Sequence, residues 1–259
     1  MEASEQALIE KIKQKPEFLG LDDSIVLSSL QKFLKKIKAT PAELKPREEK
    51  IVVKHVRAEL RTLSGQFEGG IKERKKLSGL ENVDELLKTH TSTSERLDFY
   101  PELKKFIKSL KVRSILDLGC GLNPLVLANP EIEYYASDIR KDELDLISNF
   151  FKKNNIRGKT FIFDLRTISE SSNLPKTDFC LLLKVLDIIE ENSHKLAEKV
   201  ISLVPSKKIL ISFPTKKLSG RPMNFPKRIW LEKMLERLNY PFKRFYSSNE
   251  IFYFVEKSS

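Results

Sequence analysis

A segment near the middle of the chain joins an apolar run to two glycines and a proline. Residues 115–124 are Ile-Leu-Asp-Leu-Gly-Cys-Gly-Leu-Asn-Pro. Gly119 and Gly121 allow a sharp turn and let a ligand approach the backbone closely, and Asn123-Pro124 is typical of a helix start. The pattern predicts a ligand-binding loop between a strand and a helix, although tight turns also use glycine for structural reasons alone.

Two acidic residues follow the next two apolar runs of the chain. Asp138 ends the run Tyr-Tyr-Ala-Ser-Asp, and Asp164 ends the run Phe-Ile-Phe-Asp. In open α/β sheets, ligands bind at the carboxyl ends of strands, where a carboxylate can accept both hydroxyls of a ribose. We expect Asp138 in that position, and we expect Asp164 or the backbone after it to bind an adenine amino group. Each carboxylate could instead cap the following helix.

The same loop distinguishes two classes of nucleotide-binding enzyme. A nicotinamide-dependent enzyme more often has G-x-G-x-x-G, which requires glycine at the position of Pro124. The loop is similar to the glycine-rich first loop of class I methyltransferases. We therefore expect S-adenosylmethionine as the cofactor.

The chain offers few groups for acid–base or nucleophilic chemistry. Residues 182–188 contain neither the Asn/Asp-Pro-Pro-Tyr/Phe signature of exocyclic amine methylation nor a Pro-Cys pair. Cys180 is expected in the middle of a strand, and His55 and His194 fall in helical patterns. We predict no catalytic side chain and no metal. An acceptor that needs no deprotonation, such as guanine N7, fits this inventory, because catalysis then consists mainly of alignment.

The elements that must position these residues change character at residue 113. Apolar runs alternate from there with helical patterns, which is typical of a parallel sheet covered by helices. The chain ends in a predicted hairpin, so we expect an α/β, Rossmann-like sheet that is mostly parallel with its last strand antiparallel. The predicted strands are 113–118, 133–137, 160–164, 179–183, 208–213, 241–246 and 251–255, and the predicted helices are 143–154, 188–203 and 227–239.

Residues 1–88 are predicted to form an N-terminal helical domain, followed by a second domain at 89–259. Val26, Leu30 and Phe33 recur at helical spacing, as do Val52 and Val56 in a second helix. Lysines and arginines occupy other faces of both helices. The formal net charge is +11, and the excess positive charge lies in residues 1–112 and 204–259. This distribution favours a polyanionic partner, although a lysine-rich proteome would produce a similar surface.

Other totals restrict the location of the protein. No apolar run reaches the roughly 20 residues that a membrane helix needs, and the first residues show no basic segment followed by an apolar one. The two cysteines are too few for a disulfide framework. We expect a cytoplasmic monomer that does not bind membranes.

Five stretches together resemble one family. They are HTSTSERL at 90–97, DLGCGLNP at 117–124, SDI at 137–139, KVL at 184–186 and ISFPTKKLSGR at 211–221. The combination is similar to the aminoglycoside-resistance ribosomal RNA methyltransferases of the FmrO/Arm/Rmt type over residues 86–256. Those enzymes methylate N7 of a guanine in the decoding site of 16S rRNA.

The resemblance implies roles for individual residues. Arg96 would hold the methionine carboxylate of the cofactor, Asp138 the ribose, and Asp164 with Leu165 the adenine. The basic N-terminal helices would dock on the rRNA of the small ribosomal subunit, and the target base would be flipped out of its helix. The implied cofactor-binding residues are Arg96, Asp117, Gly119, Cys120, Gly121, Asp138, Ile139, Asp164, Leu165 and Lys184, and the implied RNA-binding residues are Lys184, Lys216, Lys217 and Arg221.

Two positions depart from the family pattern. Asp187 stands where resistance enzymes usually have proline, and residues 222–225 replace a Lys-Gly-Met run. The exact target nucleotide and a role in aminoglycoside resistance therefore stay open. The alternatives are a methyltransferase for another RNA, a nucleotide or a small molecule, and a catalytically silent rRNA-binding protein with the same fold.

Overall fold

The computed structural model describes residues 3–64, 83–190, 193–216, 220–224 and 226–258. Its centre is a seven-stranded sheet in the order β3-β2-β1-β4-β5-β7-β6. The first five strands are parallel, and β7 runs antiparallel between β5 and β6, which confirms the predicted sheet. The strands are β1 Ser114–Leu118, β2 Glu133–Asp138, β3 Gly158–Ile162, β4 Thr177–Leu183, β5 Ser206–Pro214, β6 Phe242–Tyr246 and β7 Glu250–Glu256.

Helices cover both faces of the sheet and bury a separate apolar cluster on each. Phe179 and Leu181 of β4 belong to one cluster, whereas the alternate residues Cys180 and Leu182 belong to the other. A strand buried on both faces explains the near-continuous apolar run of β4. The first face is covered by α7 Tyr100–Ser109, α8 Pro124–Leu127 and α9 Lys141–Lys153, and the second by α10 Leu186–Ile189, α11 Lys195–Leu203 and α12 Ile229–Arg237.

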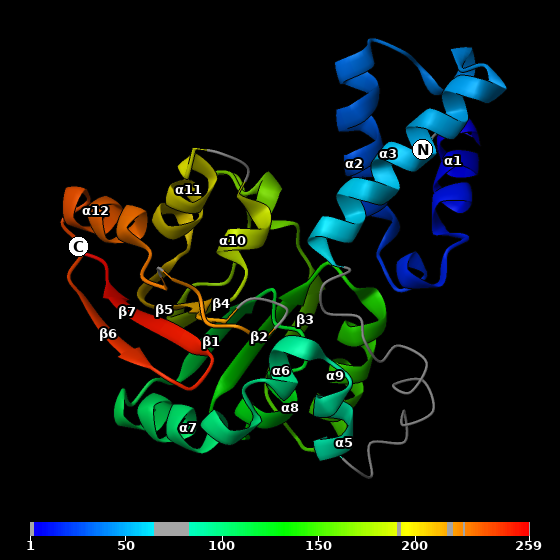
Figure 1. The fold of residues 1–259 in the computed structure, drawn as a ribbon. Helices are drawn as coiled ribbons and strands as arrows, with labels where there is room; N and C mark the ends of the chain where they lie inside the picture. The colour runs from blue at the N-terminus through cyan, green and yellow to red at the C-terminus, as the bar shows by residue number, and fades with distance from the viewer. Residues whose placement is uncertain (1–2, 65–82, 191–192, 217–219, 225, 259) are drawn as a thin grey trace.

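The N-terminal helices form a third apolar cluster. Val26 and Leu30 of α2 pack with Val52, Val56 and Leu60 of α3, as their spacing predicted. Figure 1 shows α1–α3 gathered beside the β3 end of the sheet, with α12 and the β6–β7 hairpin at the other end. These helices are α1 Ala3–Lys13, α2 Asp23–Ile37 and α3 Pro46–Leu63, joined by η1 Pro16–Phe18 and η2 Pro41–Glu43. They are followed by α5 Val83–Lys88, α6 Thr91–Ser94 and η4 Leu97–Phe99.

Most predicted bounds shift by one or two residues, and two differences concern the site. The third strand ends at Ile162, where its partner β2 also ends at Asp138, and Asp164 instead caps the short helix η5 Leu165–Thr167. The predicted helix 188–203 is divided into α10 and α11, because Glu190 is extended and its carboxylate accepts the backbone N–H of Ala197 at 2.9 Å. In the described part of the chain, every helix is too short or too polar to cross a bilayer.

Candidate cofactor site

A cavity opens at the carboxyl ends of β1, β2 and β4. Residues from the glycine loop after β1, from the ends of β2 and β4 and from the N-terminal helix α3 line it together. Most of the predicted cofactor residues are therefore brought to one place. The lining residues are Leu63, Ser64, His90, Ser92, Gly119, Gly121, Asp138, Ile139, Arg140, Glu143, Phe163, Asp164, Leu165, Leu183, Lys184, Val185, Ile188 and Ile189.

The loop after β1 needs glycine at two positions. Gly119 and Gly121 have φ of 68° and 48°, which L side chains rarely adopt. A Cβ on Gly119 would lie 2.3 Å from Val185 Cγ1, and one on Gly121 would lie 2.7 Å from the His90 ring. The loop thus presents bare backbone to the cavity.

Asp138 lies in the cavity wall with its carboxylate held by backbone. Its Oδ2 accepts the N–H of Gly121 at 3.0 Å, and its Oδ1 accepts the N–H groups of Ile139 at 2.7 Å and Arg140 at 3.2 Å. Burial, helped by the charge of Glu143, raises the pKa of Asp138 to about 6. The carboxylate is pre-oriented and still lines the cavity, so its capping contacts are compatible with ligand binding.

Asp164 is tied more tightly to its own turn. Its Oδ1 accepts the backbone N–H of Arg166 at 2.9 Å, and the two side chains form an ion pair at 2.6 Å. The capping alternative is therefore realised here, although Asp164 and Leu165 also line the cavity.

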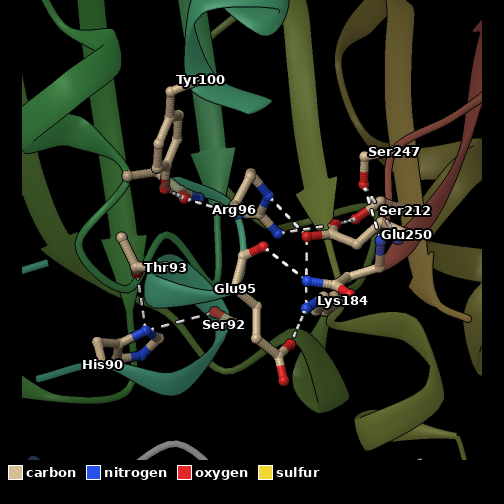
Figure 2. Close-up of polar contacts among 12 residues, drawn as sticks. His90, Ser92, Thr93, Glu95, Arg96, Tyr100, Lys184, Ser212, Ser247 and Glu250 are labelled. Atoms are coloured by element: carbon tan, nitrogen blue, oxygen red, sulfur yellow. Dashed lines mark hydrogen bonds and ion pairs between the residues drawn. The ribbon is translucent and has the colours of Figure 1, made fainter. Parts of the chain in front are cut away.

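Arg96 lies behind the cavity in a buried ion pair that the sequence did not predict. Its Nε and Nη2 each donate to the Glu250 carboxylate at 2.9 Å, and its Nη1 donates to Asn123 Oδ1 at 2.7 Å. Lys184 reaches the same carboxylate at 3.4 Å and also pairs with Glu95 (Figure 2). Burial opposes ionisation of Glu250, but Arg96 and Lys184 outweigh it and hold its pKa below the ordinary value.

Each nitrogen of the Arg96 guanidinium donates one hydrogen bond, and Arg96 is not among the residues that line the cavity. Its predicted contact with the cofactor carboxylate stays a prediction. Asn123 and Pro124 start α8 as predicted, and the side-chain oxygen of Asn123 accepts from Arg96 and from Tyr100 at 2.7 Å rather than from the helix. Arg96 and Glu250 are 154 positions apart, so no local sequence pattern links them. The sequence shows only that Glu250 comes directly before the apolar residues of β7.

Asp117 and Cys120 support the loop from behind and do not line the cavity. Tyr134 donates its hydroxyl to Asp117 Oδ2 at 2.7 Å, and burial raises the pKa of Asp117 to about 7. Its Oδ1 is buried without a hydrogen-bond partner among the described residues. Burial also raises the pKa of the Cys120 thiol well above its usual value, so this cysteine is a poor nucleophile.

The predicted RNA-binding residues fall into two groups. Lys216 and Arg221 are exposed after β5, in a segment closed by a bridge between Lys216 and Pro222. Lys184 is buried in the cavity wall, with a left-handed backbone, rather than on the exposed surface. Lys217 lies outside the described residues. Asp187, one of the unusual positions, forms an ion pair with Arg228 at 2.6 Å.

Comparison with known families accounts for this arrangement. The family described as "Ribosomal RNA methyltransferase (FmrO)" matches residues 58–255. The chain belongs to this FmrO family. Relatives include the 16S rRNA (guanine(1405)-N(7))-methyltransferases of Serratia marcescens, 31% identical over 54% of this chain and 55% of the relative, and of Micromonospora rosea, 28% identical over 66% and 64%. The match thus spans less than two thirds of either relative.

Solved structures agree on the fold of this FmrO member. The 16S rRNA methyltransferase RmtF in complex with S-adenosyl-L-homocysteine superposes with a TM-score of 0.79 at 22% identity, covering 100% of both chains. The 16S rRNA methylase RmtB gives 0.77 at 21% identity, with 98% of both chains covered. Together with the strand order, this establishes a class I methyltransferase fold.

Proposed function

We propose that this FmrO-family chain transfers the methyl group of S-adenosylmethionine to N7 of a guanine in the decoding site of 16S rRNA. One observation carries the proposal. A bare glycine loop and the carboxylates of Asp138 and Asp164 share one cavity in a member of an rRNA methyltransferase family. The specificity for guanine 1405 that the relatives' names state supports the N7 target.

The donor set fits an adenosine-containing cofactor. Asp138 would accept the ribose hydroxyls, and Asp164 with Leu165 would hold the adenine. The apolar side chains of Ile139 and Val185 would flank them, and all five residues line the cavity. When bound, the cofactor supplies a methyl group on a sulfonium, and the protein aligns it with the acceptor.

Guanine N7 carries a free lone pair, so the protein needs no general base. The task of the site is to hold the base in line with the methyl group and to exclude water. N7 lies in the deep, narrow major groove of A-form RNA, which side chains cannot enter, so the base must be flipped out. Residues 1–88 would then dock on rRNA phosphates, and 89–259 would carry the chemistry.

A methyl-transfer assay tests the function directly. Labelled S-adenosylmethionine is incubated with intact small subunits, naked rRNA and a metabolite pool, and the product is mapped by strand cleavage at 7-methylguanine. Label at a decoding-site guanine of the subunit supports the proposal. Label on small molecules would favour the metabolite alternative, and the absence of cofactor binding in calorimetry would favour a silent RNA-binding protein.

Replacing Arg221 by alanine should weaken binding to the small subunit and spare cofactor binding. Each lost phosphate contact is expected to lower the slope of log affinity against log salt by roughly 0.7–0.9. The measurement is a salt titration of subunit affinity. Arg157→Ala is the matched control, because Arg157 is also exposed but directly precedes β3, at the amino edge of the sheet. An unchanged slope for Arg221→Ala would remove Arg221 from the RNA-facing residues.

Cofactor affinity should rise with pH across about 6. The ionised form of Asp138 accepts the ribose hydroxyls, and its pKa in the free protein is raised to about 6. Below that pH a proton must be lost on binding, so the dissociation constant falls by up to about tenfold per unit of rising pH and levels off above it. Calorimetry from pH 5 to 8 measures this. Asp138→Asn should flatten the profile, and a variant that keeps the slope would assign the titration to another group.

A further inference from the structure

The N-terminal helical region is attached to the second domain directly behind Asp138. The backbone N–H of Asp22 donates to the carbonyl of Ile139 at 3.1 Å, and the N–H of Lys141 donates to the carbonyl of Gly20 at 2.9 Å. The residues immediately after the ribose-binding candidate are therefore held by the segment between α1 and α2.

A second attachment lies behind Asp164 and passes through one side chain. Arg166 donates from Nε and Nη2 to the Asp164 carboxylate at 2.6–3.0 Å. Its Nη1 also donates to Glu59 of α3 at 2.7 Å and to Ser29 of α2 at 3.2 Å. The Arg166 side chain is only 13% exposed, so a single guanidinium orients the adenine-binding candidate from two N-terminal helices.

The third contact is the wall of the cavity itself. Leu63, the last residue of α3, and Ser64 line the cavity together with the glycine loop. Figure 1 shows α3 running down to the sheet at this end. The N-terminal helices thus contribute part of the cavity surface, hold the backbone next to Asp138 and orient the Asp164 carboxylate through Arg166.

We propose that the N-terminal helices and the cofactor cavity are energetically coupled, with Arg166 as the positioning residue that links them. The inference rests on the proposed function, because it requires the cavity to bind S-adenosylmethionine. When rRNA binds α2 and α3, it restricts the motion of Ser29 and Glu59, which hold Arg166. Arg166 and Asp164 are then already ordered, so the cofactor loses less conformational entropy on binding. Linkage requires the effect to be reciprocal: bound cofactor tightens rRNA docking by the same factor.

The test uses the full chain and S-adenosylhomocysteine, which cannot be turned over. Its dissociation constant is measured by calorimetry with and without saturating small subunits, for the wild type, Glu59→Gln and Ser29→Ala. Glu49→Gln is the matched control, because Glu49 lies on the same helix and pairs with Lys11 at 2.7 Å, away from the cavity residues. Thermal unfolding shows that each variant is folded.

The wild type is expected to bind the ligand several-fold more tightly in the presence of subunits. Glu59→Gln should bind it roughly 3- to 10-fold more weakly in isolation, which corresponds to about 0.7–1.4 kcal/mol, and should lose most of the gain from subunits. Ser29→Ala should lose less of this affinity and of the gain from subunits, and Glu49→Gln should lose neither. If Glu59→Gln and Ser29→Ala both bind S-adenosylhomocysteine as tightly as the wild type and gain as much affinity from subunits, the coupling is overturned and the proposed function is not. No binding by the wild type would overturn the proposed function and the coupling with it.

Discussion

Replacing Glu250 by alanine should lower the melting temperature by roughly 6–20 °C, because breaking a buried ion pair costs about 3–5 kcal/mol and a domain of this size shifts about 2–4 °C per kcal/mol. Both side chains of the pair are almost fully buried, with exposed fractions of 1% for Arg96 and 0% for Glu250. Without Glu250, the guanidinium keeps Asn123 as a neutral acceptor but loses its countercharge.

The loss should exceed that of one contact, because Glu250 also accepts from Ser212 at 2.7 Å and faces Lys184. Differential scanning calorimetry measures the effect. Glu198→Ala is the control, since Glu198 pairs with the exposed Arg237 at 2.6 Å and exposed pairs contribute little. The double replacement Arg96→Met with Glu250→Leu should be less destabilised than Glu250→Ala, because neither charge is left buried alone. If Glu250→Ala melts at the same temperature as Glu198→Ala, the buried pair does not stabilise the fold.

The order of helices and strands could be predicted from the sequence, and so could the cavity residues of the glycine loop and the end of β2. Alternation of apolar runs and helical patterns is set by burial, so it predicted a mostly parallel sheet with an antiparallel strand at its end. Asp138 was correctly predicted at the end of β2, because the apolar residues before it mark the strand. Gly119 and Gly121 were correctly predicted in a tight turn, because glycine is the residue that adopts positive φ without strain.

The remaining contacts depend on pairing between distant segments, which periodicity does not encode. Arg96 looked like a ligand-binding arginine, yet its nearest carboxylate is Glu250 at the start of β7. Asp164 looked like the last residue of a strand, yet Arg166, two positions later, turns it into a cap. The role of Arg166 as a link to α2 and α3 could not be derived without the packing of the N-terminal helices on the sheet.

Replacing Asp138 by alanine should weaken S-adenosylmethionine binding roughly 10- to 100-fold, because a hydrogen bond to a charged acceptor contributes about 1.5–3 kcal/mol. The reason lies in the preorganisation of the carboxylate. Backbone N–H groups of Gly121, Ile139 and Arg140 fix both oxygens before any ligand arrives, so little conformational entropy is lost when the ribose binds.

Alanine also releases these three backbone donors, one of which is Gly121 of the glycine loop, so a loosened loop contributes to the loss. Asp138→Asn narrows the cause, because its amide oxygen can still accept from Ile139 and Arg140, while its NH2 group cannot accept from Gly121 and the negative charge is gone. Calorimetric dissociation constants for both variants are compared with Asp145→Ala, a carboxylate removal on the exposed face of α9. If Asp138→Asn binds as weakly as the alanine variant, the negative charge and the acceptor for Gly121 matter more than the contacts with Ile139 and Arg140. If Asp138→Ala binds like Asp145→Ala, Asp138 does not contact the cofactor and its conformation serves the loop alone.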